Sequence, residues 1–292
     1  YSQWHSTQQW IGEYREEYTY NNDGNIAEWK YFKWDQSTQK WTGDFKEQYS
    51  WLDASEVVEQ KKYDWDKGSS VWVSQTKSEY TYDPAGNLIT FIVSDWNNVV
   101  NHWVVDYKEE CTYTLNNDLA TLICSGWDQT TAQWVPDHQA EYCYGSTCLL
   151  EGVLYSTWQT NLQSWMQNYR YQYIYQNGLL SETIYSQYSP PDQQWYPKSQ
   201  ILYTYNSAGD PLITTHLERD PVNQVWKNIW KVENEYNLAG KRSKYSYMEW
   251  DSFHSLWVTY AITDYSYDAS GNLIVEENQQ YDSYNCKWYG VD

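Results

Sequence analysis

A tryptophan returns about every 31 residues along the chain, and this repeat restricts the fold more than any other feature. In most copies it is the second member of a Trp pair that encloses a short polar segment. The column comprises Trp10, Trp41, Trp72, Trp103, Trp134, Trp165, Trp195, Trp226, Trp257 and Trp288, with one interval shorter by one residue. Such self-similarity is typical of small structural units that stack on their neighbours. We therefore predict a single repeat domain over residues 1–292, with about nine to ten β-hairpin units.

A glycine turn follows the same repeat. Residues 80–90 read YTYDPAGNLIT, in which Pro84 presets φ and Gly86 supplies a positive φ. This pattern predicts a three-residue hairpin loop that pairs Tyr82 with Leu88. The structural turn glycines expected on this basis are Gly24, Gly86, Gly178, Gly209, Gly240 and Gly271, while Asn117 and Cys148 occupy the same position in two degenerate copies.

The segment between paired tryptophans predicts a second kind of turn. Residues 34–41 read WDQSTQKW, and the leading Asp35 favours a loop closed by its own side chain, with Trp facing Trp across the strand pair. Two alternating turns define an all-β, helix-free antiparallel meander of about 19–20 strands. Because each strand is rotated from its neighbour by ~20°, we expect a coiled or spiralled single sheet. The alternative is a wide closed barrel.

Strand alternation predicts how side chains divide between the two faces of the sheet. Counting by two from Trp41 places Gly43, Phe45, Glu47 and Tyr49 on one aromatic face and leaves a charged face of mixed sign. The aromatics are mainly 20 Trp and 32 Tyr against 4 Phe, so most of them carry a polar atom and suit half-wet surfaces. A carboxylate in a dry core would cost several kcal/mol. We therefore expect either a wet hollow or a single-layer sheet whose aromatics shield the backbone.

The charge and hydropathy of the chain limit the classes of binding partner that we expect. The formal net charge of -20 would repel phosphate backbones, so we predict no nucleic-acid partner. No apolar run approaches the ~18 residues of a spanning helix, so we predict no membrane insertion. Five Cys form no CxxC pair, which argues against a structural zinc site, and the disulfide state of Cys143 and Cys148 is left open.

Catalytic motifs are not found in the sequence. The histidines fall in different repeats, and the paired carboxylates recur with the repeat, as expected of a structural module and not of one acid–base site. We predict that the chain is not an enzyme and uses no cofactor or metal. A polysaccharide is the remaining candidate ligand, because sugar rings stack on Trp while polar neighbours bind hydroxyls. The candidate platforms are Trp10, Trp41, Trp72, Trp103, Trp134, Trp165, Trp195, Trp226 and Trp257, unless these rings only shield the sheet.

The turn motif resembles a known repeat. The pattern Y-x-Y-[DN]-x-x-G-N at Tyr80, Tyr18, Tyr203 and Tyr265 is similar to the YD or RHS-type repeats of bacterial and teneurin-like surface proteins. With the inserted W-D-x-x-x-x-x-W loop, it more closely resembles tandem repeats of secreted Bacteroidota proteins that carry a type IX sorting domain. That resemblance implies an extracellular or cell-surface location and no catalytic residues.

Two functions follow as expectations. The first is a structural or adhesive surface protein that self-associates into a fibre when the open sheet edges pair. The alternative is a carbohydrate-binding module that uses the Trp and Tyr ladders as stacking platforms.

Overall fold

The computed structural model describes residues 2–5, 9–53, 55–282 and 287–291, and these residues form strands and turns without a helix. β1 (Ser2–His5) and β2 (Gln9–Gly12) form a separate two-stranded sheet. The other strands are β3 (Tyr14–Tyr20), β4 (Ile26–Asp35), β5 (Lys40–Trp51), β6 (Val57–Asp66), β7 (Val71–Tyr82), β8 (Leu88–Asn97), β9 (His102–Tyr113), β10 (Leu119–Asp128), β11 (Gln133–Tyr144), β12 (Leu150–Gln159), β13 (Ser164–Gln176), β14 (Leu179–Ser189), β15 (Gln194–Tyr205), β16 (Pro211–Arg219), β17 (Trp226–Tyr236), β18 (Arg242–Asp251), β19 (Leu256–Tyr267), β20 (Leu273–Asp282) and β21 (Lys287–Val291).

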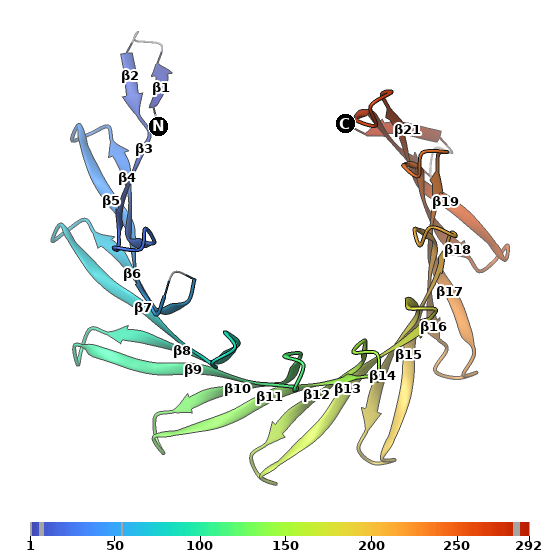
Figure 1. Cartoon of the computed structure of the whole chain (residues 1–292), viewed down its shortest axis with the longest axis horizontal. Coiled ribbons are helices and arrows are strands. Elements are labelled where there is room, and N and C mark those ends of the chain that lie inside the picture. The colour runs from blue at the N-terminus through green and yellow to red at the C-terminus, as the bar shows by residue number, and fades with distance from the viewer. Residues whose placement is uncertain (1, 6–8, 54, 283–286, 292) are drawn as a thin grey trace. The chain divides into compact units, whose positions relative to one another are not determined.

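The strands β3 to β21 form one antiparallel meander of 19 strands, which confirms the predicted all-β fold (Figure 1). Two compact units divide the chain, Tyr1–Glu141 with Thr157–Ser164 and Tyr142–Ser156 with Trp165–Asp292. Strand ladders join consecutive strands from β3 to β11 and from β13 to β21. The sheet is not closed into a barrel, so the alternative of a wide closed barrel is wrong.

The glycine turns close as their chemistry requires. Tyr82 pairs with Leu88, and the Asp83 carboxylate accepts hydrogen bonds from the backbone N–H groups of Ala85 (2.8 Å) and Asn87 (2.9 Å). The six turn glycines have φ between 74° and 90°, where a Cβ would be strained. In the Gly178 turn, Gln176 pairs with Leu179 across a two-residue loop, and this explains the one interval that is a residue shorter.

The loops between paired tryptophans are closed by an aspartate. The Asp35 carboxylate accepts bonds from the Ser37 N–H (2.8 Å), the Ser37 hydroxyl (2.7 Å) and the Thr38 N–H (3.4 Å). These bonds lower the pKa of Asp35 to about 2, because they favour the charged form. Gln39 ends the loop with φ 56°, and its N–H donates to the Asp35 carbonyl at 2.8 Å. This left-handed residue was not predictable from the sequence, because it is not a glycine.

A β-bulge in each of seven ascending strands overturns the predicted division of side chains between faces. On β5, Gly43 pairs with Phe32 and Phe45 pairs with Tyr31, which leaves Asp44 as an extra residue. Equivalent shifts interrupt β7, β9, β11, β15, β17 and β19. One extra residue reverses the alternation from that point onward. Trp41 and Phe45 therefore lie on opposite faces of the sheet, and the prediction that they share one face is wrong.

We call the two faces the Trp face and the Tyr face. The Trp face carries the paired tryptophans with Phe32, Gly43 and Lys46, and the Tyr face carries Phe45 with the residues that alternate with it toward the glycine turn.

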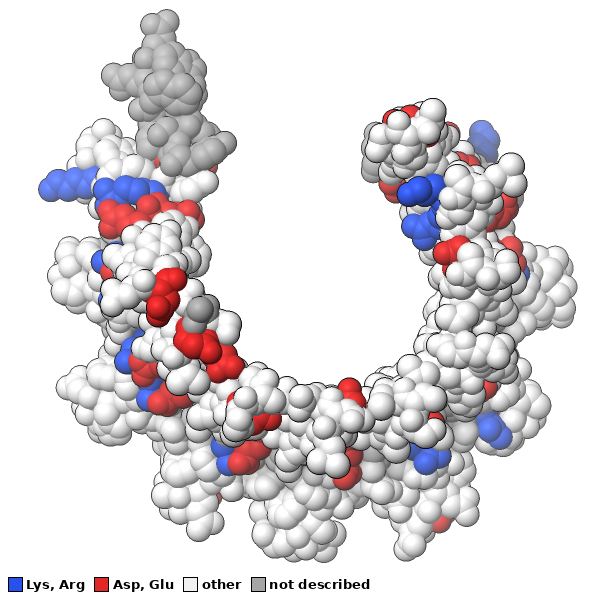
Figure 2. Space-filling model, viewed as in Figure 1, with Lys and Arg blue, Asp and Glu red and all other residues white. Residues whose placement is uncertain are grey.

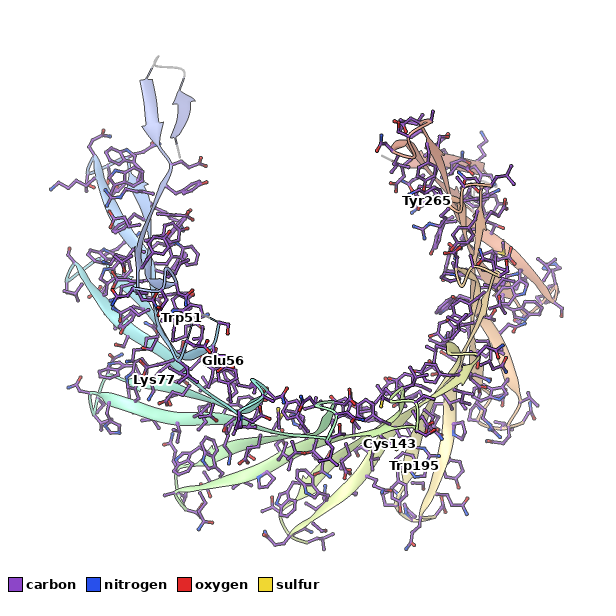
Figure 3. All side chains as sticks on the ribbon, in the orientation of Figure 1. Trp51, Glu56, Lys77, Cys143, Trp195 and Tyr265 are labelled. Atoms are coloured by element: carbon purple, nitrogen blue, oxygen red, sulfur yellow. The ribbon has the colours of Figure 1, made fainter. Side chains whose placement is uncertain are left out.

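The sheet is a single layer with side chains on both faces (Figure 3). Among the described residues, the buried hydrophobic side chains are Cys124, Ala140 and Val153, and Ser94 and Ser186 are the largest that are fully buried. Most aromatic rings are half-buried. A dry packed core would bury its large side chains, so the described aromatics do not form such a core.

Candidate functional site

In five long hairpins the paired tryptophans form T-shaped contacts at the loop end. The ring centroids lie 5.1 Å apart in Trp34–Trp41, 5.0 Å in Trp65–Trp72, 5.1 Å in Trp96–Trp103, 5.1 Å in Trp127–Trp134 and 5.0 Å in Trp250–Trp257. In two hairpins a tyrosine is the partner, in Tyr188–Trp195 and Tyr281–Trp288, and Arg219 lies over Trp226. Edge-to-face geometry is favourable for aromatic pairs. These ring contacts therefore stabilise the pairing of the two strands at the loop end of the hairpins that contain them.

All the predicted platforms from Trp41 to Trp257 are half-buried. Each is therefore partly shielded by its own neighbours but keeps part of its surface in solvent. The side chain of Trp10 lies outside the described part of the structure. Their use as sugar platforms stays a prediction.

A basic side chain of the preceding hairpin covers many of these rings. The cation lies over the ring centroid in the pairs Arg15–Trp41 (5.4 Å), Lys46–Trp72 (5.9 Å), Lys108–Trp134 (5.2 Å), Arg170–Trp195 (4.6 Å) and Lys231–Trp257 (5.0 Å). A cation over an aromatic ring contributes ~0.5–1 kcal/mol at exposed sites. Burial lowers the pKa of Lys46 and of Arg170. These cations, spaced like the tryptophans, are a signal that the sequence reasoning missed.

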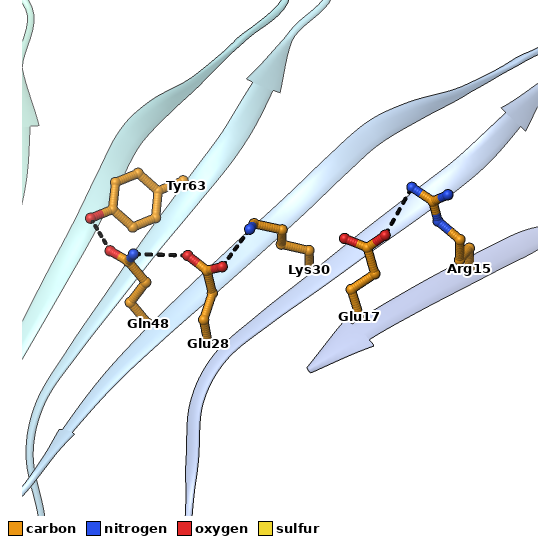
Figure 4. Close-up of polar contacts among 6 residues, drawn as sticks. All are labelled: Arg15, Glu17, Glu28, Lys30, Gln48 and Tyr63. Atoms are coloured by element: carbon orange, nitrogen blue, oxygen red, sulfur yellow. Dashed lines mark hydrogen bonds and ion pairs between the residues drawn. The ribbon is translucent and has the colours of Figure 1, made fainter. Parts of the chain in front are cut away.

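Polar bonds continue the Trp face toward the glycine turns (Figure 4). Tyr63 donates to Gln48 Oε1 at 2.7 Å, Gln48 donates to Glu28 at 2.9 Å, and Lys30 pairs with the same carboxylate. Comparable ion pairs link Lys77 with Glu79 and Lys108 with Glu110, both at 2.7 Å. Figure 2 shows acidic and basic side chains next to one another along the first compact unit. Charge on this face is largely paired within the sheet.

On the Tyr face, a repeated hydrogen bond joins the two strands of a long hairpin near the end opposite the Trp loop. The last aromatic residue of an ascending strand donates to a backbone carbonyl 25 residues earlier, at the start of the preceding descending strand. These donors and acceptors are Trp51 to Ile26 (2.9 Å), Tyr82 to Val57 (2.9 Å), Tyr113 to Leu88 (2.8 Å), Tyr175 to Leu150 (3.1 Å), Tyr205 to Leu180 (2.8 Å), Tyr236 to Pro211 (2.9 Å) and Tyr267 to Arg242 (2.9 Å). The repeated bond requires a side-chain O–H or N–H donor at this position, which Tyr and Trp carry and Phe lacks.

The Tyr82→Phe substitution is expected to destabilise the protein by about 1 kcal/mol, because the Val57 carbonyl loses its side-chain donor while the ring stays in place. Chemical denaturation followed by circular dichroism measures the change. Tyr20→Phe is the matched control, since Tyr20 occupies the same register position in β3 but is 60% exposed. Equal effects from the two substitutions would contradict the assigned contribution of this hydrogen bond.

Successive long hairpins separate from each other near their Trp ends. The β9–β10 ladder begins at Tyr107 and Gly126, and the β17–β18 ladder begins at Trp230 and Glu249. Beyond these pairs each strand bonds only within its own hairpin among the described residues. The separation opens clefts, one of about 390 Å³ beside Asp95 and Trp96 and one of about 710 Å³ beside Trp230 and Trp250. A sequence repeat cannot show such clefts, because they depend on where pairing stops.

Other chemistry is limited in the part of the chain that the structure describes. No cluster of three or more His, Cys, Asp or Glu residues is placed to hold a metal ion there. Cys143 and Cys148 are both exposed, and no disulfide joins them. None of the described segments is a helix long and apolar enough to cross a membrane.

Comparison with known proteins finds no matching family model and no matching curated sequence. Among solved structures, a protein of unknown function from Bacteroides fragilis aligns with 43% of this chain and 88% of its own at 13% identity and a TM-score of 0.36. The TcdB2-TccC3-TEV structure aligns with 96% of this chain and 14% of its own at 12% identity and a TM-score of 0.44. A DUF3836 family protein from Parabacteroides distasonis aligns with 31% of this chain and 84% of its own at 23% identity and a TM-score of 0.25. These similarities assign no function to the chain.

Proposed function

We propose that the chain is an extracellular or cell-surface repeat protein with a structural and adhesive role, and that it self-associates by strand pairing at the edge of its sheet. The observation that carries the proposal is the exposed edge strand β3, in which every residue after Tyr14 is exposed. Long exposed edges are ready templates for another strand. The location rests on the resemblance of the repeat to those of secreted Bacteroidota proteins.

The backbone N–H and C=O groups of β3 alternate between facing β4 and facing away from it. The Trp34 N–H donates to the Glu13 carbonyl at 3.3 Å, so the backbone groups of Glu13, Arg15 and Glu17 face β4. Antiparallel alternation turns the N–H and C=O groups of Glu16 and Tyr18 away from β4. Those groups are therefore available to a strand of a second copy.

The Glu16→Pro substitution tests this edge, because it removes an outward N–H and leaves the β3–β4 ladder intact. We expect the parent chain to form larger species as concentration rises and Glu16→Pro to stay monomeric, measured by sedimentation velocity and electron microscopy. Glu16→Ala is the control, since it removes the same carboxylate and keeps the N–H. A parent chain that stays monodisperse and monomeric at high concentration would refute the proposal.

A further inference from the structure

The larger of the clefts between long hairpins has a chemical character of its own. It lies between the hairpin of β16 and β17 and the hairpin of β18 and β19, within the second compact unit. Its volume of about 710 Å³ falls in the range of small-molecule sites, ~300–1,000 Å³. Trp226, Trp230 and Trp250 line it together with Tyr247, and Lys227 and Glu249 add charge.

Trp230 departs from the repeat. It lies outside the Trp pairs, and the same module position holds Phe45, Thr76, Tyr107, His138, Tyr169, Ser199 or Ala261 in other copies. The fold therefore does not need a tryptophan here. The cleft of about 390 Å³ between the β8–β9 and β10–β11 hairpins shows the contrast, because it is lined by Val104 and Val105 with one tryptophan, Trp96.

The aromatic rings that line the cleft are held in place by their neighbours. The Trp230 ring lies 5.2 Å from the His216 ring and 6.4 Å from the Tyr247 ring, at interplanar angles of 31° and 34°. Trp250 is fixed by its T-shaped contact with Trp257. Rings that are already ordered lose little conformational entropy when a ligand stacks on them.

The polar groups of the cleft suit a ligand with many hydroxyls. Glu249 is exposed, accepts a bond from the Tyr247 hydroxyl at 3.2 Å and keeps further acceptor capacity. Lys227 is already paired with Asp220, so the site offers little free positive charge for an anion. The net charge of -20 disfavours anionic ligands as well.

From these features we infer that the cleft between the two hairpins binds a neutral oligosaccharide, with pyranose rings stacked on Trp230 and Tyr247 and a hydroxyl donating to Glu249. Flat aromatic surface with a few placed acceptors is what sugar rings require. The two rings proposed to stack on the sugar, Trp230 and Tyr247, are not members of the repeated Trp column, although Trp226 and Trp250 also line the cleft. Binding here does not depend on association through β3.

Isothermal titration of the full chain with cellohexaose and with maltohexaose tests the inference. We expect a Kd on the order of 0.1–1 mM for at least one of the two. Trp230→Ala should weaken binding at least tenfold, and Glu249→Gln, a surface substitution that leaves the strand pairing unchanged, should weaken it several-fold.

The matched control is Asp95→Asn, which alters the same module position as Glu249 in the smaller cleft and should leave affinity unchanged. Binding of neither oligosaccharide would overturn the inference. Binding that survives both Trp230→Ala and Glu249→Gln would overturn it too, because the ligand would then lie elsewhere. Circular dichroism of each variant verifies the fold.

Discussion

Replacing Gly43 with alanine is expected to destabilise the first compact unit by about 1–3 kcal/mol, the usual cost of overpacking a close contact. Gly43 is buried on the Trp face, and a Cβ there would lie 2.6 Å from Cδ2 and 2.7 Å from Cε3 of Trp65. The indole would have to move, and with it the Trp65–Trp72 contact at 5.0 Å. The midpoint of chemical denaturation and the hydrogen exchange of β5 and β6 amides measure the effect.

Gly126→Ala is the control for this substitution. Nothing lies within 4 Å of the Cβ position of Gly126, and its φ is not positive, so the change should alter stability by less than about 0.5 kcal/mol. If Gly43→Ala proved as mild as Gly126→Ala, the close packing of Trp65 against β5 would be refuted.

Raising the pH from 10 to 12 is expected to unfold the protein, and this is the second large effect. Burial, and then the hydrogen bond to the Glu47 carboxylate, raise the pKa of Tyr49 to about 12. Burial also raises the pKa of Tyr82, Tyr113 and Tyr205, whose hydroxyls bond to backbone carbonyls of the preceding strand. An ionised hydroxyl cannot donate, so each of these contacts fails on deprotonation.

The direction of the pH effect follows from linkage. A tyrosine titrates near pH 10 in the unfolded chain, so a raised folded pKa contributes stability that is complete below pH ~10 and is lost as pH rises through the folded value. For the half-buried Tyr49 the contribution is about 1–2 kcal/mol after allowance for solvent screening.

Tyrosinate absorbance and far-ultraviolet circular dichroism, recorded together against pH, measure this transition. Loss of sheet signal should coincide with a late phase of tyrosine ionisation. Tyr49→Phe should retain more of its own stability between pH 10 and 12 than the parent chain does, because one titrating group is removed. Ionisation of all tyrosines near pH 10 with an unchanged sheet signal would be the contrary result.

Local features of the fold were predictable from the sequence because they depend on short-range chemistry. Asp83, Pro84 and Gly86 define one turn by themselves, and Asp35 defines the other through bonds to the next few residues. Two turns that alternate at a fixed interval leave antiparallel hairpins as the connection between them. The all-β meander was therefore predicted correctly.

The assignment of faces failed for an equally physical reason. The face of a strand residue is inferred from an odd or even offset along the sequence. The bulge at Asp44 adds one residue to that offset, and no turn residue in the sequence indicates it. The extra residues of β5, β7, β9 and β15 are Asp44, Gln75, Asp106 and Lys198, which are ordinary strand residues. Only the pairing with the neighbouring strand shows that Trp41 and the residues from Phe45 to Tyr49 that alternate along β5 lie on opposite faces.

Some features of the candidate sites were also predictable from the sequence, and others were visible only in the tertiary structure. The sequence by itself determined the Trp column and the positions of the turns, because a repeat is visible wherever the same local chemistry returns. The tertiary structure alone decided that cations such as Lys46 cover Trp rings, that Tyr82 bonds to Val57, and that a cleft opens beside Trp230. These contacts join residues of different strands, and their distances depend on where the ladders begin, end and bulge.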